Sequence, residues 1–196
     1  MNTSQNIHAY LLKLVILIGI AAAVVTASPV TGSARQPGSQ SMEAGYSALR
    51  LFLQDEQRLT TIRRIKTVLT FDGVSSRTAK LIDQIADSSE QALEDLEALS
   101  AAKPAIIFEK FDDDSIGKAT LDSMRYSTAK EFIFDKGEFE KSLLLSQSQI
   151  LPVISHLARQ LEQNETNAKR KAWLNDLADR YDDYYRKVYA RISVTT

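Results

Sequence analysis

Residues 139–161 read FEKSLLLSQSQILPVISHLARQL, and their apolar positions recur with the period of a helix. These positions are Phe139, Leu143, Ile150, Ile154, Leu157 and Leu161. Because such spacing places side chains on one face of an α-helix, we expect this segment to be the core helix against which the rest of the chain packs. Pro152 lacks the backbone N–H that would bond four residues back, so a bend is predicted near Ser148.

Three other segments carry the same periodicity, at residues 42–71, 75–99 and 168–192. A short polar turn at 163–167 indicates antiparallel neighbours, whereas 100–137 is long enough to cross the bundle and contains a helix of its own. No segment shows the two-residue period of a strand. We therefore predict an all-α fold with the connectivity of a ferritin-like antiparallel four-helix bundle, in which a long helical crossover joins helices 2 and 3.

The first 27 residues predict a secretory signal peptide. A weakly basic start containing Lys13 precedes the small and apolar run 14–25, and the small residues up to Ala27 suit a cleavage site. The run is shorter than the roughly 20 apolar residues that a membrane-spanning helix needs. We expect cleavage after Ala27, with Ala34 as the alternative, and no transmembrane span after cleavage.

Residues 28–40 are Ser, Gly, Pro, Thr and Gln-rich, and Arg35 is their only charged residue. A segment of this composition cannot bury enough apolar surface to offset the entropy of ordering. It therefore predicts a flexible leader. The remaining residues, 41–196, match the size of one domain and are predicted to form the helical bundle.

The composition excludes several classes of protein. The chain has no cysteine, so it has no disulfide and no thiolate metal site. It has 24 Lys and Arg residues against 25 Asp and Glu residues, and loss of the signal peptide removes Lys13 alone. Such a balance gives no support to nucleic-acid binding.

Three polar residues interrupt the apolar faces of the predicted helices, namely Glu56, Ser89 and Gln147. A buried charge without a partner is costly, so these residues are candidates for a polar cluster in the core. We expect Glu56 to lie opposite Ser89 and to be hydrogen-bonded, ion-paired or protonated.

Two metal-site patterns are incomplete. A di-iron bundle takes Glu-x-x-His motifs from two helices, but the mature chain has only His156, and Val153 stands where the Glu would be. Residues 112–123 begin with three Asp residues, yet Ile116 and Ser123 stand where a calcium loop requires an oxygen ligand and a bidentate Glu. We therefore predict no metal site, no cofactor and no catalytic residue, since a nucleophile elbow and a phosphate-cradling loop are missing as well.

Two apolar groups are candidates for interfaces. The last helix carries Trp173, Tyr181, Tyr185 and Tyr189. We predict that these aromatic residues are half core and half interface, with hydroxyls at the wet rim, and that they could alternatively bind a carbohydrate or peptide. A second group comprises Ile106, Ile107, Phe108 and Phe111. We expect it to pack on the bundle, with a partner-binding patch as the alternative.

Several segments together carry a family resemblance. They are Glu56, residues 80–89 (KLIDQIADSS), residues 131–135 (EFIFD) and residues 173–177 (WLNDL). Over residues 46–192 the chain resembles a family of bacterial exported ferritin-like proteins of unknown function, which implies a four-helix bundle of the periplasm or envelope. The histidines common in that family are replaced, the first by Ser88 or Ser89 and the second by Ser146 or Gln147. A metal role implied by the resemblance is therefore in doubt.

These observations predict an exported protein, periplasmic or extracellular, that acts as a non-enzymatic envelope binding or accessory protein with a partner that the sequence does not name. The alternative function is a ferritin-like metal-binding or oxidase domain. Elemental analysis separates the two, because stoichiometric iron, manganese or zinc surviving dialysis favours the alternative.

Overall fold

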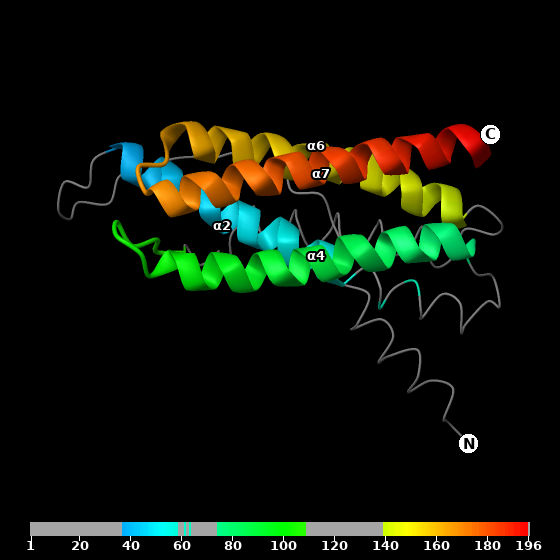
Figure 1. Ribbon diagram of the computed structural model, residues 1–196, viewed down its shortest axis with the longest axis horizontal. Helices are drawn as coiled ribbons and strands as arrows, with labels where there is room; N and C mark the ends of the chain where they lie inside the picture. Colours follow the sequence, from blue (N-terminus) through cyan, green and yellow to red (C-terminus); the bar gives the residue numbers. More distant parts are fainter. Residues whose placement is uncertain (1–36, 59–60, 62, 64–73, 109–138, 196) are drawn as a thin grey trace, which may run out of the picture.

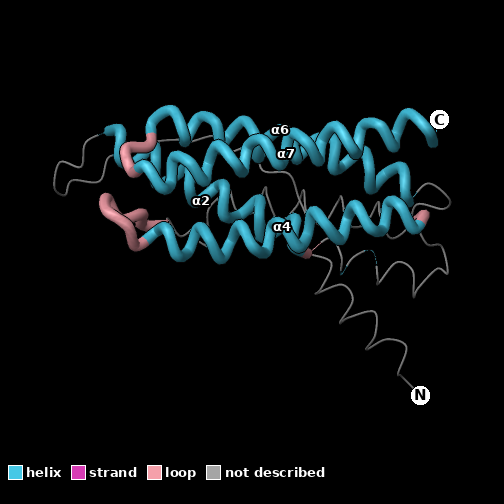
Figure 2. Tube along the Cα trace, viewed as in Figure 1, coloured by secondary structure: helices cyan, strands magenta, loops and turns pink. Residues whose placement is uncertain are grey.

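The protein is an α-helical bundle. The computed structural model describes residues 37–58, 61, 63, 74–108 and 139–195. Its helices are α2 (Pro37–Gln57), α4 (Ser76–Ser100), α6 (Phe139–Asn164) and α7 (Ala168–Thr195). They lie alongside one another (Figure 1), and the described residues form no strand (Figure 2). The predicted all-α four-helix bundle is confirmed.

The directions of the helices account for the long connection in the sequence. In Figure 1, α4 and α6 run in the same direction, while α2 and α7 run in the opposite one. Helix α2 packs on α4 and α6, and α7 packs on α6 and α4. The end of α4 and the start of α6 therefore lie at opposite ends of the bundle. The helix predicted within this connection lies outside the described residues.

All four helices contribute to one hydrophobic core. Its most deeply buried members include Leu49 and Leu53 of α2, Ile82 and Ile85 of α4, Leu143, Leu151 and Ile154 of α6, and Leu174, Leu177 and Val188 of α7. Burying large apolar side chains is the main favourable term in folding. The bundle is thus held by packing, in keeping with a chain that has no cysteine.

Helix α6 has the burial pattern that its sequence predicts. It is helical from Phe139 to Asn164, through Pro152, and the bend expected there stays a prediction. Gly45 allows α2 to approach this helix closely, because a Cβ atom at that position would lie 2.8 Å from Cδ2 of Leu161. Any larger residue at position 45 would require Leu161 to move.

The start of α4 is fixed by a cap and by a carboxylate from another helix. Ser75 is the N-cap, and its Oγ accepts a hydrogen bond from the Thr78 backbone N–H. Glu140 of α6 accepts hydrogen bonds from the Ser75 backbone N–H at 2.9 Å and the Ser75 hydroxyl at 2.6 Å. The Thr78 hydroxyl donates to the same carboxylate. These contacts tie the first turn of α4 to the first turn of α6.

Two predicted boundaries differ from the structure. Residues 37–40, predicted as part of the leader, belong to α2, because proline is well tolerated in the first turn of a helix and Pro37 begins this one. The first helix was predicted to reach residue 71, whereas α2 ends at Gln57 and most of the following stretch lies outside the described residues.

The apolar group at the end of α4 is only partly packed. Ile106 and Phe108 contact the core, and the Arg50 guanidinium lies 4.7 Å from the centre of the Phe108 ring. Ile107 is 54% exposed, so the prediction that it packs on the bundle is wrong. Its side chain points to solvent because it alternates with two neighbours that face the core. Phe111 lies outside the described residues.

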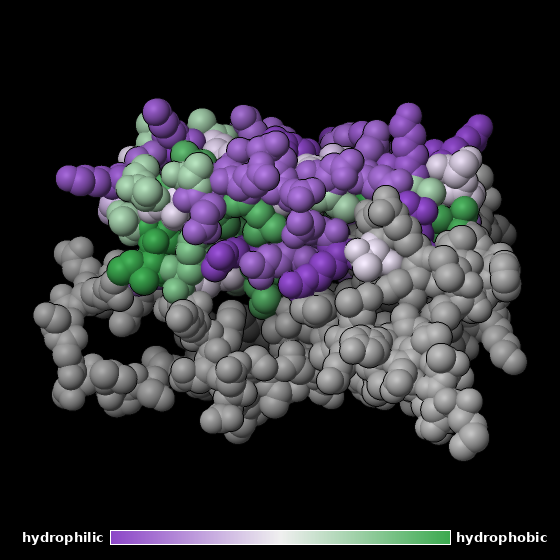
Figure 3. All heavy atoms as spheres, turned by 90° about the horizontal axis from the view of Figure 1, so that it is seen from below, coloured by the Kyte–Doolittle hydropathy of each residue, from purple (hydrophilic) through white to green (hydrophobic). Residues whose placement is uncertain are grey.

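Figure 3 shows one face of the molecule, on which hydrophilic residues predominate among those described and hydrophobic residues are most numerous toward one end of the bundle. No helix in the described part of the chain has the length and hydropathy to span a bilayer.

Candidate functional site

The predicted polar residues all lie in the core. Glu56 of α2 is 3% exposed, Gln147 of α6 is 1% exposed, and Ser89 of α4 is fully buried. The Gln147 side chain lies near the Glu56 carboxyl group and acts to lower its pKa. Each helix places its polar residue inward because flanking apolar residues hold that face against the core. Glu56 also acts on the pKa of Tyr181, whose hydroxyl lies 2.5 Å from that of Ser89. The expectation that Glu56 lies opposite Ser89 stays a prediction.

The pKa of Glu56 is strongly raised. Burial is the main cause, and the neighbouring Asp55 carboxylate adds to it, so that the pKa reaches about 8 despite the opposing effect of Gln147. Among the described residues, Oε2 of Glu56 and Oε1 of Gln147 have no hydrogen-bond partner. Protonation makes one carboxyl oxygen a donor, and an amide oxygen is an acceptor. The chemistry of this pair therefore suits a neutral carboxylic acid beside an amide.

Ser89 pairs with the last helix. Its hydroxyl donates to the Ile85 carbonyl at 2.8 Å and lies 2.5 Å from the Tyr181 hydroxyl. Because the Ser89 proton is directed at Ile85, Tyr181 is the donor in the second bond. Tyr181 is fully buried, and burial is the main cause of its raised pKa. Its predicted place at an interface is wrong, because its hydroxyl finds a partner in the core and needs no water.

The other predicted interface aromatics differ in exposure. Trp173 and Tyr185 pack partly against the core, and among the described residues the Trp173 indole N–H has no partner. Tyr189 is 59% exposed, and its ring centre lies 6.1 Å from that of Tyr185. Tyr189 is the member of the group that is open to contact from outside.

A second buried polar cluster, which the sequence analysis missed, closes one end of the bundle. The side chains of Arg170 and Glu165 are 2% and 3% exposed. Arg170 donates from Nε and Nη2 to the two Glu165 oxygens, at 2.7 Å and 3.1 Å. The Tyr46 hydroxyl and the Asn167 backbone N–H donate to the same carboxylate, and Nη1 of Arg170 donates to the Ala102 carbonyl at 2.8 Å.

In this Glu165–Arg170 cluster, the two charges are paired with each other. Burial raises the pKa of Glu165, but the hydrogen bonds from Arg170 and Tyr46 outweigh it, so its pKa lies below the ordinary value. One signal could have revealed the cluster: Arg170 extends the apolar face of Leu174 and Leu177 by one turn. The charges are fully engaged within the protein, so the cluster is structural.

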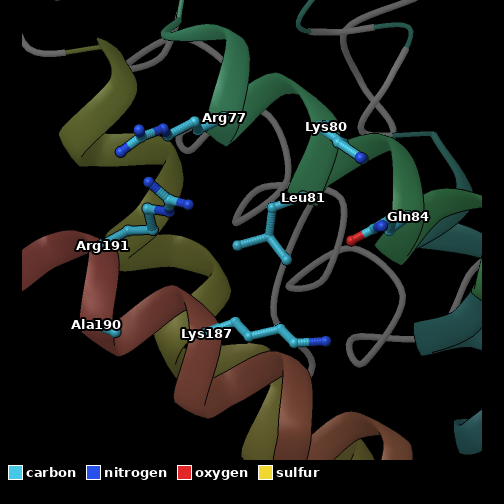
Figure 4. Close-up of a pocket in the computed structure, with 7 residues that line it drawn as sticks. All are labelled: Arg77, Lys80, Leu81, Gln84, Lys187, Ala190 and Arg191. Atoms are coloured by element: carbon cyan, nitrogen blue, oxygen red, sulfur yellow. The ribbon is translucent and has the colours of Figure 1, made fainter.

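A group of cationic side chains lines a cleft between α4 and α7. This cleft of about 500 Å³ is lined by Arg77, Lys80, Leu81 and Gln84 of α4 and by Lys187, Ala190 and Arg191 of α7. Four of these seven residues are cationic and none is acidic. Figure 4 shows the guanidinium groups of Arg77 and Arg191 near each other on one side of Leu81, whereas the Lys80 and Lys187 side chains lie apart, one above and one below Leu81.

Two carboxylates near this basic cleft offset part of its charge. Nζ of Lys187 lies 2.6 Å from the Asp183 carboxylate. Burial raises the pKa of Glu140, but hydrogen bonds from Ser75 and Thr78 and the charge of Arg191 bring it below the ordinary value. Glu140 is engaged in capping α4, and Asp183 points along α7. Neither carboxylate lines the cleft.

The described residues contain no group of three or more His, Asp or Glu side chains that could hold a metal ion. His156 is exposed. The metal-binding alternative stays a prediction.

The chain matches no protein-family model, no curated protein and no solved structure.

Proposed function

We propose that this protein is an exported, non-enzymatic binding protein of the bacterial envelope, and that its ligand is anionic and occupies the basic cleft between α4 and α7. The observation that carries the proposal is that the described residues lining the cleft include four cations and no acid. Folded proteins normally intersperse charges of both signs on their surfaces. A hollow lined by one sign concentrates oppositely charged ligands.

The buried polar groups of the core differ from the cations of the cleft, and this difference supports the proposal of an anion site in the cleft. Glu165 and Arg170 neutralise each other, and Glu56 is buried in the core near Gln147. These groups are inaccessible to a ligand. Two of the cations that line the cleft, Arg77 and Lys80, are exposed.

The cleft is tested by titrating the purified protein with pyrophosphate and with citrate in a calorimeter. We expect binding that weakens as salt is added, because exposed charges are screened. The double substitution Arg77→Gln/Arg191→Gln should weaken it at least tenfold, which corresponds to about 1.4 kcal/mol.

A matched control changes the net charge equally at a distance from the cleft. Lys169→Gln/Lys171→Gln removes two cations from the start of α7, outside the cleft lining. This variant should bind as the parent does. Equal losses in both double variants would mean that net charge alone attracts the anions and that the cleft is no site.

Export is tested separately by N-terminal sequencing of material recovered from outside the cytoplasm. The small residues at Val25 and Ala27 predict a mature chain that starts at Ser28. A chain that starts at Met1 in the membrane pellet would mean that the hydrophobic run is retained as an anchor, and the export proposal would be wrong.

A further inference from the structure

The turn between α6 and α7 carries a short motif of known chemistry. Residues 164–166 read NET, so the hydroxyl side chain of Thr166 follows Asn164 at the second position, with no proline between them. Asn-x-Ser/Thr is the acceptor motif for N-linked glycosylation of exported proteins. The sequence has one other such triplet, at residues 2–4, which lies within the predicted signal peptide. Asn164 is therefore the acceptor that the exported chain would keep.

The folded protein leaves room for a sugar at this position. Asn164 is the last residue of α6, and both Asn164 and Thr166 are exposed. Nδ2 of Asn164 donates to the Gln160 carbonyl at 2.8 Å, within its own helix. By contrast, Asn167 caps the start of α7 with its Oδ1 and donates from Nδ2 to the Lys103 carbonyl. The amide of Asn164 is thus available for attachment, whereas that of Asn167 holds the turn in place.

From this arrangement we infer that Asn164 is N-glycosylated during export, by transfer of an oligosaccharide from a polyprenyl diphosphate carrier. Nδ2 forms a bond to the anomeric carbon of the sugar, the bond from that carbon to the diphosphate oxygen breaks with its electron pair passing to the diphosphate, and one amide proton is released. Nδ2 keeps one N–H, which is enough to retain the bond to the Gln160 carbonyl. The inference rests on the proposed export and is independent of the anion cleft.

The buried cluster at this turn sets the time of the transfer. A transferase must bind the residues on both sides of the acceptor, and Glu165 directly follows Asn164. Glu165 is 7% exposed, and its carboxylate accepts hydrogen bonds from Arg170 and Tyr46. Once this cluster has formed, drawing the segment into an enzyme separates a buried ion pair, which is costly. Transfer therefore precedes closure of the bundle, while the chain is still being exported.

The position of Asn164 keeps a glycan away from the basic cleft. The turn lies at the opposite end of the bundle from the start of α4 and the end of α7, which line the cleft (Figure 1). At 1.5 Å per residue, Ala168 and Lys187 are separated by roughly 30 Å along α7. A glycan on Asn164 therefore extends from one end of the bundle and leaves the cleft open.

The test is tandem mass spectrometry of the full chain, exported by a bacterium that carries an oligosaccharyltransferase and its polyprenyl diphosphate-linked oligosaccharide. Trypsin cleaves after Arg159 and Lys169 and so releases residues 160–169 as one peptide. The parent should carry the oligosaccharide on Asn164. Thr166→Ser keeps the hydroxyl and should stay modified, whereas Thr166→Ala should lower the modified fraction at least tenfold. Both variants change an exposed side chain, so both should fold as the parent does.

Failure of this inference is distinguishable from failure of the proposed function. An exported chain that starts at Ser28 and carries an unmodified Asn164 would overturn the inference and leave the export and the anion cleft in place. A sugar on Thr166, or an equal modified fraction in Thr166→Ala, would overturn it as well. A chain found only in the cytoplasm would contradict both the export and the glycosylation. If the purified, folded parent is modified as fast as Arg170→Met, the buried cluster does not set the time of transfer.

Discussion

As the pH rises from about 5 to about 8, the parent protein is expected to lose stability that the Glu56→Gln variant keeps. The pKa of Glu56 is about 8 in the folded state, against an ordinary value of 4.5. In this pH range the folded carboxyl group holds its proton, and the unfolded chain has released it. Unfolding therefore releases a proton, and rising pH favours unfolding. The contribution is fully present below pH 4.5 and is lost as the pH passes through about 8.

The expected effect is a few kcal/mol, because each unit of pKa shift corresponds to about 1.4 kcal/mol. Urea unfolding of both proteins at several pH values measures it. The difference between the two curves isolates Glu56, because glutamine keeps the shape of the side chain and does not ionise. Glu94→Gln, on the exposed face of α4, should run parallel to the parent. A parallel curve for Glu56→Gln as well would mean that the folded protein holds Glu56 ionised.

Replacement of Arg170 by Met is expected to destabilise the protein by about 3 to 5 kcal/mol, the usual cost of removing one partner of a buried ion pair. The substitution leaves the Glu165 carboxylate in the core without a counter-charge and removes the donor to the Ala102 carbonyl. Urea unfolding at neutral pH measures the loss. Arg186→Met, at an exposed position on the same helix, should change stability by no more than about 0.5 kcal/mol.

The double variant Glu165→Gln/Arg170→Met checks the cause. It removes the stranded charge, so it should recover part of the stability lost in Arg170→Met. The single variant Glu165→Gln is measured as well. If the loss of stability in the double variant equals the sum of the losses in Glu165→Gln and Arg170→Met, the loss in Arg170→Met comes from packing and from the Ala102 contact.

The helices could be predicted because their pattern is local. The period in residues 139–161 depends only on which residues face one side of a single helix, and the buried positions of α6 follow it. The same pattern identified Glu56, Ser89 and Gln147 as polar residues on apolar faces. The pattern could not identify the hydrogen-bond partners of these residues. A partner lies on another helix, and which residue it is depends on the axial register and rotation of the two packed helices.

Tyr181, which was placed at an interface, and the cations of the basic cleft, which were not identified, also depend on how separate helices pack. Tyr181 is on the core face of α7 by its spacing, but only the packing of α4 against α7 shows that Ser89 satisfies its hydroxyl. The basic cleft brings together Arg77 and Lys187, which lie far apart in the chain on surfaces that periodicity reads only as solvated. Because the numbers of acidic and basic residues are nearly equal over the whole chain, its composition does not indicate a local excess of cations.

The turn between α6 and α7 bears on how the protein could be re-engineered. Short exposed loops between antiparallel helices are the usual places to open a chain for circular permutation or to insert a guest domain. Here the turn carries Glu165, whose carboxylate must stay five residues from Arg170 and within reach of Tyr46. New termini or an insert at residues 165–167 would separate the charges and leave both of them buried. The turn between α6 and α7, although short, is therefore a poor place for a graft.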